Sequence, residues 1–327
     1  MPQVETIGGP IDVSQLGTTL MHEHIFVLTP ELQTTYPGYE GWDPDKYVPI
    51  AQQKLSELKQ LGVDTIVDLT VVGTGRDIEL VARAVEGTGL QVIVATGIYT
   101  YKDLPKAFYF RGPGTELGGD DEPMISLFVR DIEEGIQGTG IKAGILKCAT
   151  DEPGITNDVE RVLRAVAAAH HRTGVPISTH THAATERGLE QQRIFEEEGV
   201  DLTRVIIGHS GDSTDPDYLE KLVSKGSLIG MDRFGIDVQV PFEDRVNIVA
   251  EMCKRGHAKS MVLSHDASVF IDWLPQEAIP VALPNWHYRH IHEDVLPALR
   301  ERGVSDEDID LMLVQNPREF FSRQGAY

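Results

Sequence analysis

The chain has 327 residues, of which 41% are hydrophobic and 24% charged, a composition typical of a globular protein with one large core. Its 51 acidic and 29 basic residues give a formal net charge of −22, which disfavours binding to nucleic acid or to an anionic membrane. With only two cysteines, no leader-like start and no apolar run of about 20 residues, we expect a soluble, cytoplasmic protein without disulfides.

The first elements of the chain surround a pair of histidines. Residues 1–17 hold Gly-Gly-Pro between short β-like pieces, which predicts a small hairpin or flap. A strand is expected at residues 18–27, where His22 and His24 project from the same face because side chains alternate along a strand. Two such imidazoles can bind one transition-metal ion, although a merely hydrogen-bonded pair at a strand end is the simpler alternative. The Pro-rich residues 29–49 are predicted to be a loop over the site.

From residue 50 onward, predicted helices and strands alternate, and glycine follows several of the helices as a C-cap signal. Strands are expected at residues 18–27, 65–70, 91–98, 143–149, 177–181, 204–208, 227–232 and 260–265. Helices are expected at residues 50–61, 77–86, 124–137, 157–173, 185–198, 216–224, 242–255 and 305–321. This alternation implies parallel pairing, so we predict a single (β/α)8 TIM barrel domain over residues 1–327, with long insertions at 101–122 and 267–292.

The predicted strands end in ionisable residues, and in a barrel of this type these ends carry the chemistry. Burying such groups is costly unless they are paired or bind a metal. The residues are His22, His24, Lys147, His180, His182, His209, Asp232, Arg233, His265 and Asp266. They suit two divalent ions a few Å apart, one held by the two histidines of the first strand and the other by His180 and His209. Asp266 can complete the first ion's coordination and accept a proton.

Lys147 differs from the other members of this group, because an ammonium group cannot coordinate a metal. A buried lysine has a lowered pKa and, as a neutral amine, can add CO2 to give an anionic, bidentate carbamate. The alternative is an ordinary ion pair of Lys147 with Asp151 or Glu152.

Five segments carry a resemblance to a known family. They are Thr-Leu-Met-His-Glu-His (19–24), Ile-Leu-Lys-Cys-Ala-Thr-Asp-Glu-Pro-Gly-Ile-Thr (145–156), Ser-Thr-His-Thr (178–181), Ile-Gly-His-Ser-Gly-Asp (207–212) and Leu-Ser-His-Asp (263–266). Over nearly the whole chain, the sequence resembles the phosphotriesterase family of the amidohydrolase superfamily. The resemblance implies two divalent ions (zinc, or iron, cobalt or manganese). Their implied ligands are His22, His24, carboxylated Lys147, His180, His209 and Asp266.

Two positions resemble one branch of that family, the phosphotriesterase-like lactonases. Arg233 stands where true phosphotriesterases carry a histidine, and Tyr99 ends the third strand. The branch opens N-acyl homoserine lactones, an activity known as quorum quenching, and hydrolyses organophosphates weakly. It implies that Tyr99 assists the electrophile, that Asp212 and Arg233 lie beside Asp266, and that the protein is a homodimer. From the residues alone, Tyr99 could also be a rim aromatic with a solvated hydroxyl group.

The segment at residues 267–292 is rich in apolar side chains and prolines, which is consistent with a lid over an acyl chain. Phe270, Trp273 and Leu274 are its expected substrate-facing residues, although such residues could instead cover the barrel mouth or form a dimer contact. We therefore predict a lactonase acting on a small-molecule lactone. The alternatives are a true aryldialkylphosphatase, a generic carboxylesterase, or a metal-dependent binding protein without activity.

Overall fold

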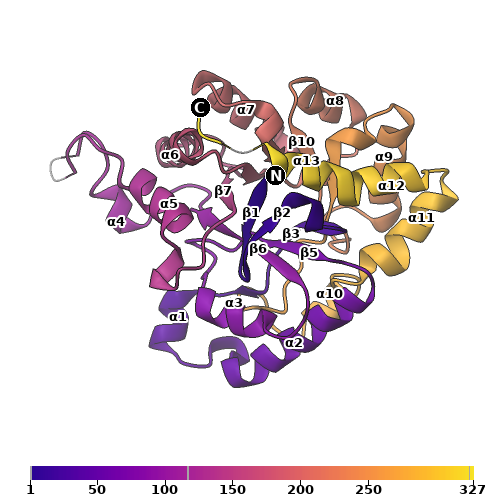
Figure 1. Ribbon diagram of the computed structural model, residues 1–327, viewed down its shortest axis with the longest axis horizontal. Helices are drawn as coiled ribbons and strands as arrows, with labels where there is room; N and C mark the ends of the chain where they lie inside the picture. Colours follow the sequence, from indigo (N-terminus) through magenta and orange to yellow (C-terminus); the bar gives the residue numbers. More distant parts are fainter. Residues whose placement is uncertain (1, 116–117, 324) are drawn as a thin grey trace.

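The structure is a computed structural model that describes residues 2–115, 118–323 and 325–327. Within this part, eight parallel strands form one sheet that is surrounded by helices (Figure 1). The strands are β3 (Thr19–Glu23), β5 (Thr65–Asp68), β6 (Gln91–Gly97), β7 (Ile145–Ala149), β8 (Ile177–His180), β9 (Val205–Ile207), β10 (Leu228–Met231) and β11 (Met261–Leu263). Strands β3 and β11 are the two edge strands of this sheet, and hydrogen bonds at their C-terminal ends close the barrel. Asp266 N–H donates to His22 O (3.0 Å), and His24 N–H donates to Ala267 O (2.9 Å). The predicted TIM barrel is confirmed.

Seven of the predicted helices are present between the strands. They are α2 (Pro44–Gln60), α3 (Ile78–Val85), α5 (Pro123–Glu133), α6 (Asn157–Thr173), α7 (Arg187–Glu197), α8 (Pro216–Ser224) and α9 (Phe242–Lys254). Helix α11 (Leu296–Glu301) was not predicted, and the single helix predicted at 305–321 is interrupted by a π-helical stretch at Leu311–Gln315. Helices α6 and α8 have the predicted bounds, because each begins at a side-chain cap: Thr156 accepts from Val159 N–H and Asp215 from Asp217 N–H. Helix α2 starts earlier than predicted, since Asp43 caps it and a first-turn proline needs no N–H partner.

Two predictions, about the first loop and the first strand, need correction. The region at 29–49 is not all loop, because it contains α1 (Pro30–Thr35) and the start of α2. The strand predicted at 18–27 is two strands: after Glu23 the chain leaves the barrel, and β4 (Phe26–Val27) pairs instead with β12 (Phe270–Ile271). The remaining short helices are α4 (Lys106–Tyr109) and α10 (Ile279–Ala282) within the two insertions, and α12 (Asp306–Asp310) and α13 (Asn316–Ser322) at the C-terminal end. Parts of the predicted regions, Met1 and residues 116–117, lie outside the described residues.

The predicted N-terminal hairpin is present, but it closes the end of the barrel opposite the ionisable residues. Strands β1 (Gln3–Thr6) and β2 (Gly9–Asp12) pair antiparallel and lie beside α13 over the middle of the barrel (Figure 1). Val4 and Phe321 pack in one buried cluster with inward-facing strand residues such as Ile145. The hairpin is therefore a plug of apolar side chains and not a flap over the site. None of the described helices is long and apolar enough to cross a membrane.

Candidate metal centre

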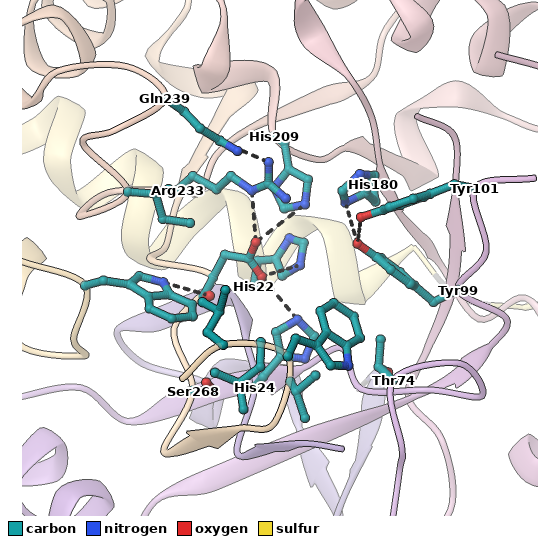
Figure 2. A pocket seen from close by; sticks show the side chains of 17 residues that line it. His22, His24, Thr74, Tyr99, Tyr101, His180, His209, Arg233, Gln239 and Ser268 are labelled. Atoms are coloured by element: carbon teal, nitrogen blue, oxygen red, sulfur yellow. Dashed lines mark hydrogen bonds and ion pairs between the residues drawn. The ribbon is translucent and has the colours of Figure 1, made fainter. Parts of the chain in front are cut away.

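Four histidines converge at the C-terminal end of the barrel. His22 lies on β3 and His180 ends β8, whereas His24 directly follows β3 and His209 follows β9 after one glycine. Figure 2 shows their imidazole rings grouped together, with Tyr99 and Tyr101 on one side and Arg233 on the other. All four rings and Asp266 line one cavity of about 270 Å³. The barrel thus brings together residues that lie as far apart in the sequence as positions 22 and 266.

The carboxylate of Asp266 lies among these rings. Its Oδ1 is 3.1 Å from His24 Nε2 and 3.4 Å from His22 Nε2, and its Oδ2 is 3.7 Å from His209 Nε2. Burial alone would raise the pKa of the Asp266 carboxyl group, but the nearby His22, His209 and Arg233 outweigh this effect and hold the pKa well below its usual value. Asp266 is therefore an anion at the centre of the cluster.

Asp232 orients two of the imidazole rings. Its two oxygens lie 2.9 Å from His22 Nδ1 and 3.0 Å from His209 Nδ1, so each ring places its proton on Nδ1. Their Nε2 lone pairs are consequently left for the cavity, as in metal-binding histidines that donate to a carboxylate. Asp232 was expected at a strand end, but its residue type and position alone predicted no role for it. The feature of the sequence that could have identified this residue is an aspartate next to Arg233, at the end of a mostly apolar strand.

The other two rings have partners that the sequence analysis did not predict. His24 Nδ1 lies 2.8 Å from Thr70 Oγ1, and His180 Nε2 lies 2.6 Å from Asp151 Oδ2. His180 therefore turns Nδ1 towards the cavity. Burial lowers the pKa of His180 to about 4, and burial with Arg233 lowers that of His209 well below its usual value. These two imidazoles are neutral, which is the form that coordinates a metal.

Lys147 is buried next to the imidazole cluster. Its Nζ lies 3.2 Å from His22 Nε2 and 3.2 Å from the Thr179 carbonyl oxygen, and no ion pair with a carboxylate forms within the described chain. The ion pair with Asp151 that we considered is not formed, because Asp151 bonds to His180 instead. Burial lowers the pKa of the Lys147 amine to about 8.

Arg233 and Asp212 lie beside Asp266, as the resemblance implies. Arg233 Nε donates to Asp266 Oδ2 (3.0 Å), and its Nη1 donates to Asp212 Oδ2 (2.9 Å). The buried Arg245 pairs with the other oxygen of Asp212 at 2.7 Å. This chain of charges restrains the Asp266 carboxylate through its Oδ2 atom.

Tyr99 lies on the opposite side of the cavity from Arg233. Its hydroxyl group contacts that of Tyr101 and lies 3.3 Å from His180 Nδ1. Burial, and then the neighbouring Tyr101, raises the pKa of Tyr99 well above its usual value, so the phenol keeps its proton and can donate it in a hydrogen bond. Tyr101 belongs to the insertion at 101–122, and the sequence analysis did not select it.

Two of the three residues expected to face a substrate line the cavity. Trp273 and Leu274 line the cavity together with Ile271, but Phe270 does not. Because consecutive strand residues face opposite ways, β12 points Ile271 into the cavity and Phe270 away from it, against Trp42 and Tyr47 (ring centroids at 4.9 and 4.5 Å). We therefore correct Phe270 from a substrate-facing residue to a residue of the aromatic core.

A TIM barrel with neutral imidazoles and an anionic carboxylate at its catalytic end defines the class of metal-dependent barrel hydrolases. The sequence model of the phosphotriesterase family matches residues 2–321, and the chain belongs to that family of binuclear metal hydrolases. The sequence is 63% identical over 328 residues to a phosphotriesterase homology protein of Mycobacterium tuberculosis, with 100% of both chains covered.

Two further comparisons agree with this membership. An aryldialkylphosphatase of Saccharolobus solfataricus is 42% identical over 314 residues, which cover 95% of this chain and 97% of that protein. The solved structure of the phosphotriesterase from Mycobacterium tuberculosis matches with a TM-score of 0.97 and 63% identity, covering 100% of both chains.

Proposed function

We propose that this hydrolase is a lactonase that opens N-acyl homoserine lactones, and that it hydrolyses organophosphate triesters only weakly. The observation that supports this most is the make-up of the cavity. Its floor holds the histidines and Asp266, and its wall holds the apolar side chains of Val27, Ile271, Trp273 and Leu274. A neutral lactone ring would occupy the polar floor, and its acyl chain would lie along the apolar wall.

The donor groups fit two divalent transition-metal ions. His22, His24 and Asp266 would hold one ion, and His180 and His209 the other, with zinc, iron, cobalt or manganese as candidates. A carbamate on Lys147 would supply the remaining anionic ligand, which is consistent with a buried amine that has no carboxylate partner among the described residues. When bound, such ions polarise a carbonyl group and lower the pKa of water to near neutrality.

The residues of the chain would perform the remaining steps of ester cleavage. Asp266 would accept a proton from the attacking water and pass it to the ring oxygen that leaves, while Arg233 holds the carboxylate in place. The Tyr99 phenol would donate a hydrogen bond to the carbonyl oxygen as that oxygen gains negative charge. Trp273 and Leu274 would shield the reacting groups from bulk water.

An aryldialkylphosphatase is the second candidate, because the relative that is 42% identical carries that name. A substrate panel on the metal-loaded protein distinguishes the two candidates. It would contain lactones with acyl chains of several lengths, an aryl phosphotriester and a simple carboxyl ester. We expect the highest kcat/KM for a long-chain lactone. A preference for the phosphotriester would favour the phosphatase, and binding without turnover of any substrate would leave only a binding protein.

Tyr99→Phe should separate lactone hydrolysis from phosphotriester hydrolysis. The planar lactone carbonyl becomes a tetrahedral oxyanion, and losing one donor to such an oxyanion costs on the order of 10²–10³ in rate. An aryl phosphotriester starts tetrahedral and has a good leaving group, so its rate should fall much less. Steady-state kinetics of both substrates measure this difference. Tyr109→Phe, an exposed tyrosine in the insertion at 101–122 that follows Tyr99, is the matched control. An unchanged lactone rate in Tyr99→Phe would contradict the role of the phenol.

Trp273→Ala should weaken the dependence of KM on acyl-chain length. Burying one methylene group contributes roughly 0.8 kcal/mol, so each additional CH2 in contact with the wall can lower KM up to about fourfold. Removing the indole ring should raise KM for long-chain lactones more than for short ones. Val281→Ala is the control, because Val281 lies in the same lid, is 82% exposed and does not line the cavity. Equal changes in KM for short and long chains would argue against an acyl-chain wall at Trp273.

A further inference from the structure

Glu23 lies between two candidate metal ligands in the sequence, but it faces away from the cavity. Its side chain and that of His265 are both 0% exposed. Glu23 Oε1 accepts hydrogen bonds from His265 Nδ1 (2.7 Å), His265 N–H (3.0 Å) and Ser264 Oγ (3.0 Å). Glu23 Oε2 accepts from Ala267 N–H (3.0 Å). A single carboxylate at the end of β3 therefore binds the residues on both sides of Asp266.

Asp266 has a backbone conformation that requires such support. Its φ angle is +54°, in the left-handed region that residues other than glycine rarely adopt. Backbone conformations of this kind persist where the surrounding contacts determine them. The three successive N–H groups of 265, 266 and 267 are all held by the end of β3: Glu23 accepts the first and third, and the His22 carbonyl accepts the second at 3.0 Å. This set of bonds aims the Asp266 carboxylate at the imidazoles.

The same turn also holds the far end of the lid. His265 Nδ1 donates to Glu23, so its Nε2 is an acceptor, and it receives the N–H of Ile291 at 3.0 Å. Trp286 Nε1 donates to the Asp266 carbonyl oxygen at 3.0 Å. The lid residues 267–292 thus begin directly after Asp266. Their far end returns to the same turn, where it bonds to Asp266 and His265.

We propose that Glu23 and His265 form a positioning pair for this site. Glu23 holds Asp266 in the conformation that reaches the metal ions, and His265 ties the end of the lid to the same turn. The first part rests on the proposed function through one assumption, that Asp266 is a metal ligand. Neither residue touches the cavity, so both act through Asp266 and the lid.

Glu23→Gln tests the first part. The amide keeps the size of the side chain but presents an NH2 group to one of the donors that the carboxylate accepts, which leaves that donor without a partner. Loss of a group that orients a metal ligand typically costs 10–100-fold in metal affinity. We expect a fall of that size in Zn²⁺ affinity, measured by competition with a chromogenic chelator, and a changed absorption spectrum of the Co²⁺-loaded protein. If Glu23→Gln does not fold, Glu23→Asp keeps the charge but withdraws the oxygens, and it should weaken Zn²⁺ binding in the same direction.

Asp131→Asn is the matched control for the loss of a buried carboxylate. Asp131 is 2% exposed and binds Arg76 (2.8 Å) and Thr96 (2.7 Å), away from the cavity. It should lower the thermal midpoint without changing the Zn²⁺ affinity or the Co²⁺ spectrum. If Glu23→Gln behaves like this control, the positioning role is wrong. If the wild-type protein itself binds no Zn²⁺, the proposed function fails instead, so the two failures are distinguishable.

His265→Asn tests the second part. The asparagine amide can still donate to Glu23, but it offers no acceptor at the former Nε2 position, so the Ile291 N–H loses its partner. We expect unchanged Zn²⁺ affinity together with a raised KM for long-chain lactones, because the lid end is released while the Asp266 turn is kept. An unchanged KM would overturn the link between His265 and the lid.

Discussion

Treatment with a strong chelator is expected to abolish hydrolysis of every substrate, and a divalent transition-metal ion is expected to restore it. Within the cavity, Asp266 is the carboxylate among the imidazoles, and its pKa lies well below the usual value, so it is too weak a base to activate water alone. Bound divalent ions lower the pKa of water from 15.7 to about 7. Elemental analysis of the reconstituted protein should find about two equivalents per chain, because six ligands are too many for one tetrahedral ion.

A pair of histidine variants makes this expectation specific to the proposed ligands. His24→Ala removes a ring whose Nε2 lies 3.1 Å from Asp266, and it should lower both metal content and activity. His182→Ala removes a ring whose hydrogen bond within the described chain goes to Thr185 Oγ1, at 2.8 Å, and it should leave both unchanged. Full activity in the metal-stripped wild-type protein would refute a metal-dependent mechanism altogether.

Lys147→Ala is expected to cost most of the activity. The amine is buried, its pKa is lowered to about 8, and it forms no ion pair with a carboxylate in the described chain. In this state a lysine amine can react with CO2, and the resulting carbamate would place an anionic group beside His22. Bicarbonate with a short carboxylic acid should partly recover the activity of the variant, because a free carboxylate can occupy the vacated position. Metal content and rate, measured with and without the added acid, provide the test.

Cys148→Ala is the matched control for this variant. Cys148 is the next residue on β7 and faces the helices, where it packs in the larger apolar core. Its loss should lower stability while metal content and rate remain those of the wild-type protein. A Lys147→Ala protein that keeps both metals and a normal rate would show that the lysine is not a ligand.

The sequence by itself determined the barrel and most residues of its catalytic end. Helix α6 has the predicted bounds because its signals are local: Thr156 caps its first turn, and Gly174 ends it at a φ angle of +72°. The side-chain alternation and strand-end positions selected His22, His180 and Asp266 from residue type and spacing alone. These signals need no knowledge of what lies across the barrel.

Only the tertiary structure decided which groups orient the site and which face the substrate. Asp232 meets two histidines from other strands, and Tyr101 reaches Tyr99 from an insertion without a regular pattern. Whether Phe270 or Ile271 lines the cavity depends on the pairing of β12 with β4, since a shift of one residue exchanges the two faces of a strand. The four donors around Glu23 come from residues 264–267, more than 240 positions away in the sequence. Hydrogen bonds over such separations arise only when the barrel closes, because the closure of β11 against β3 brings their partners into contact.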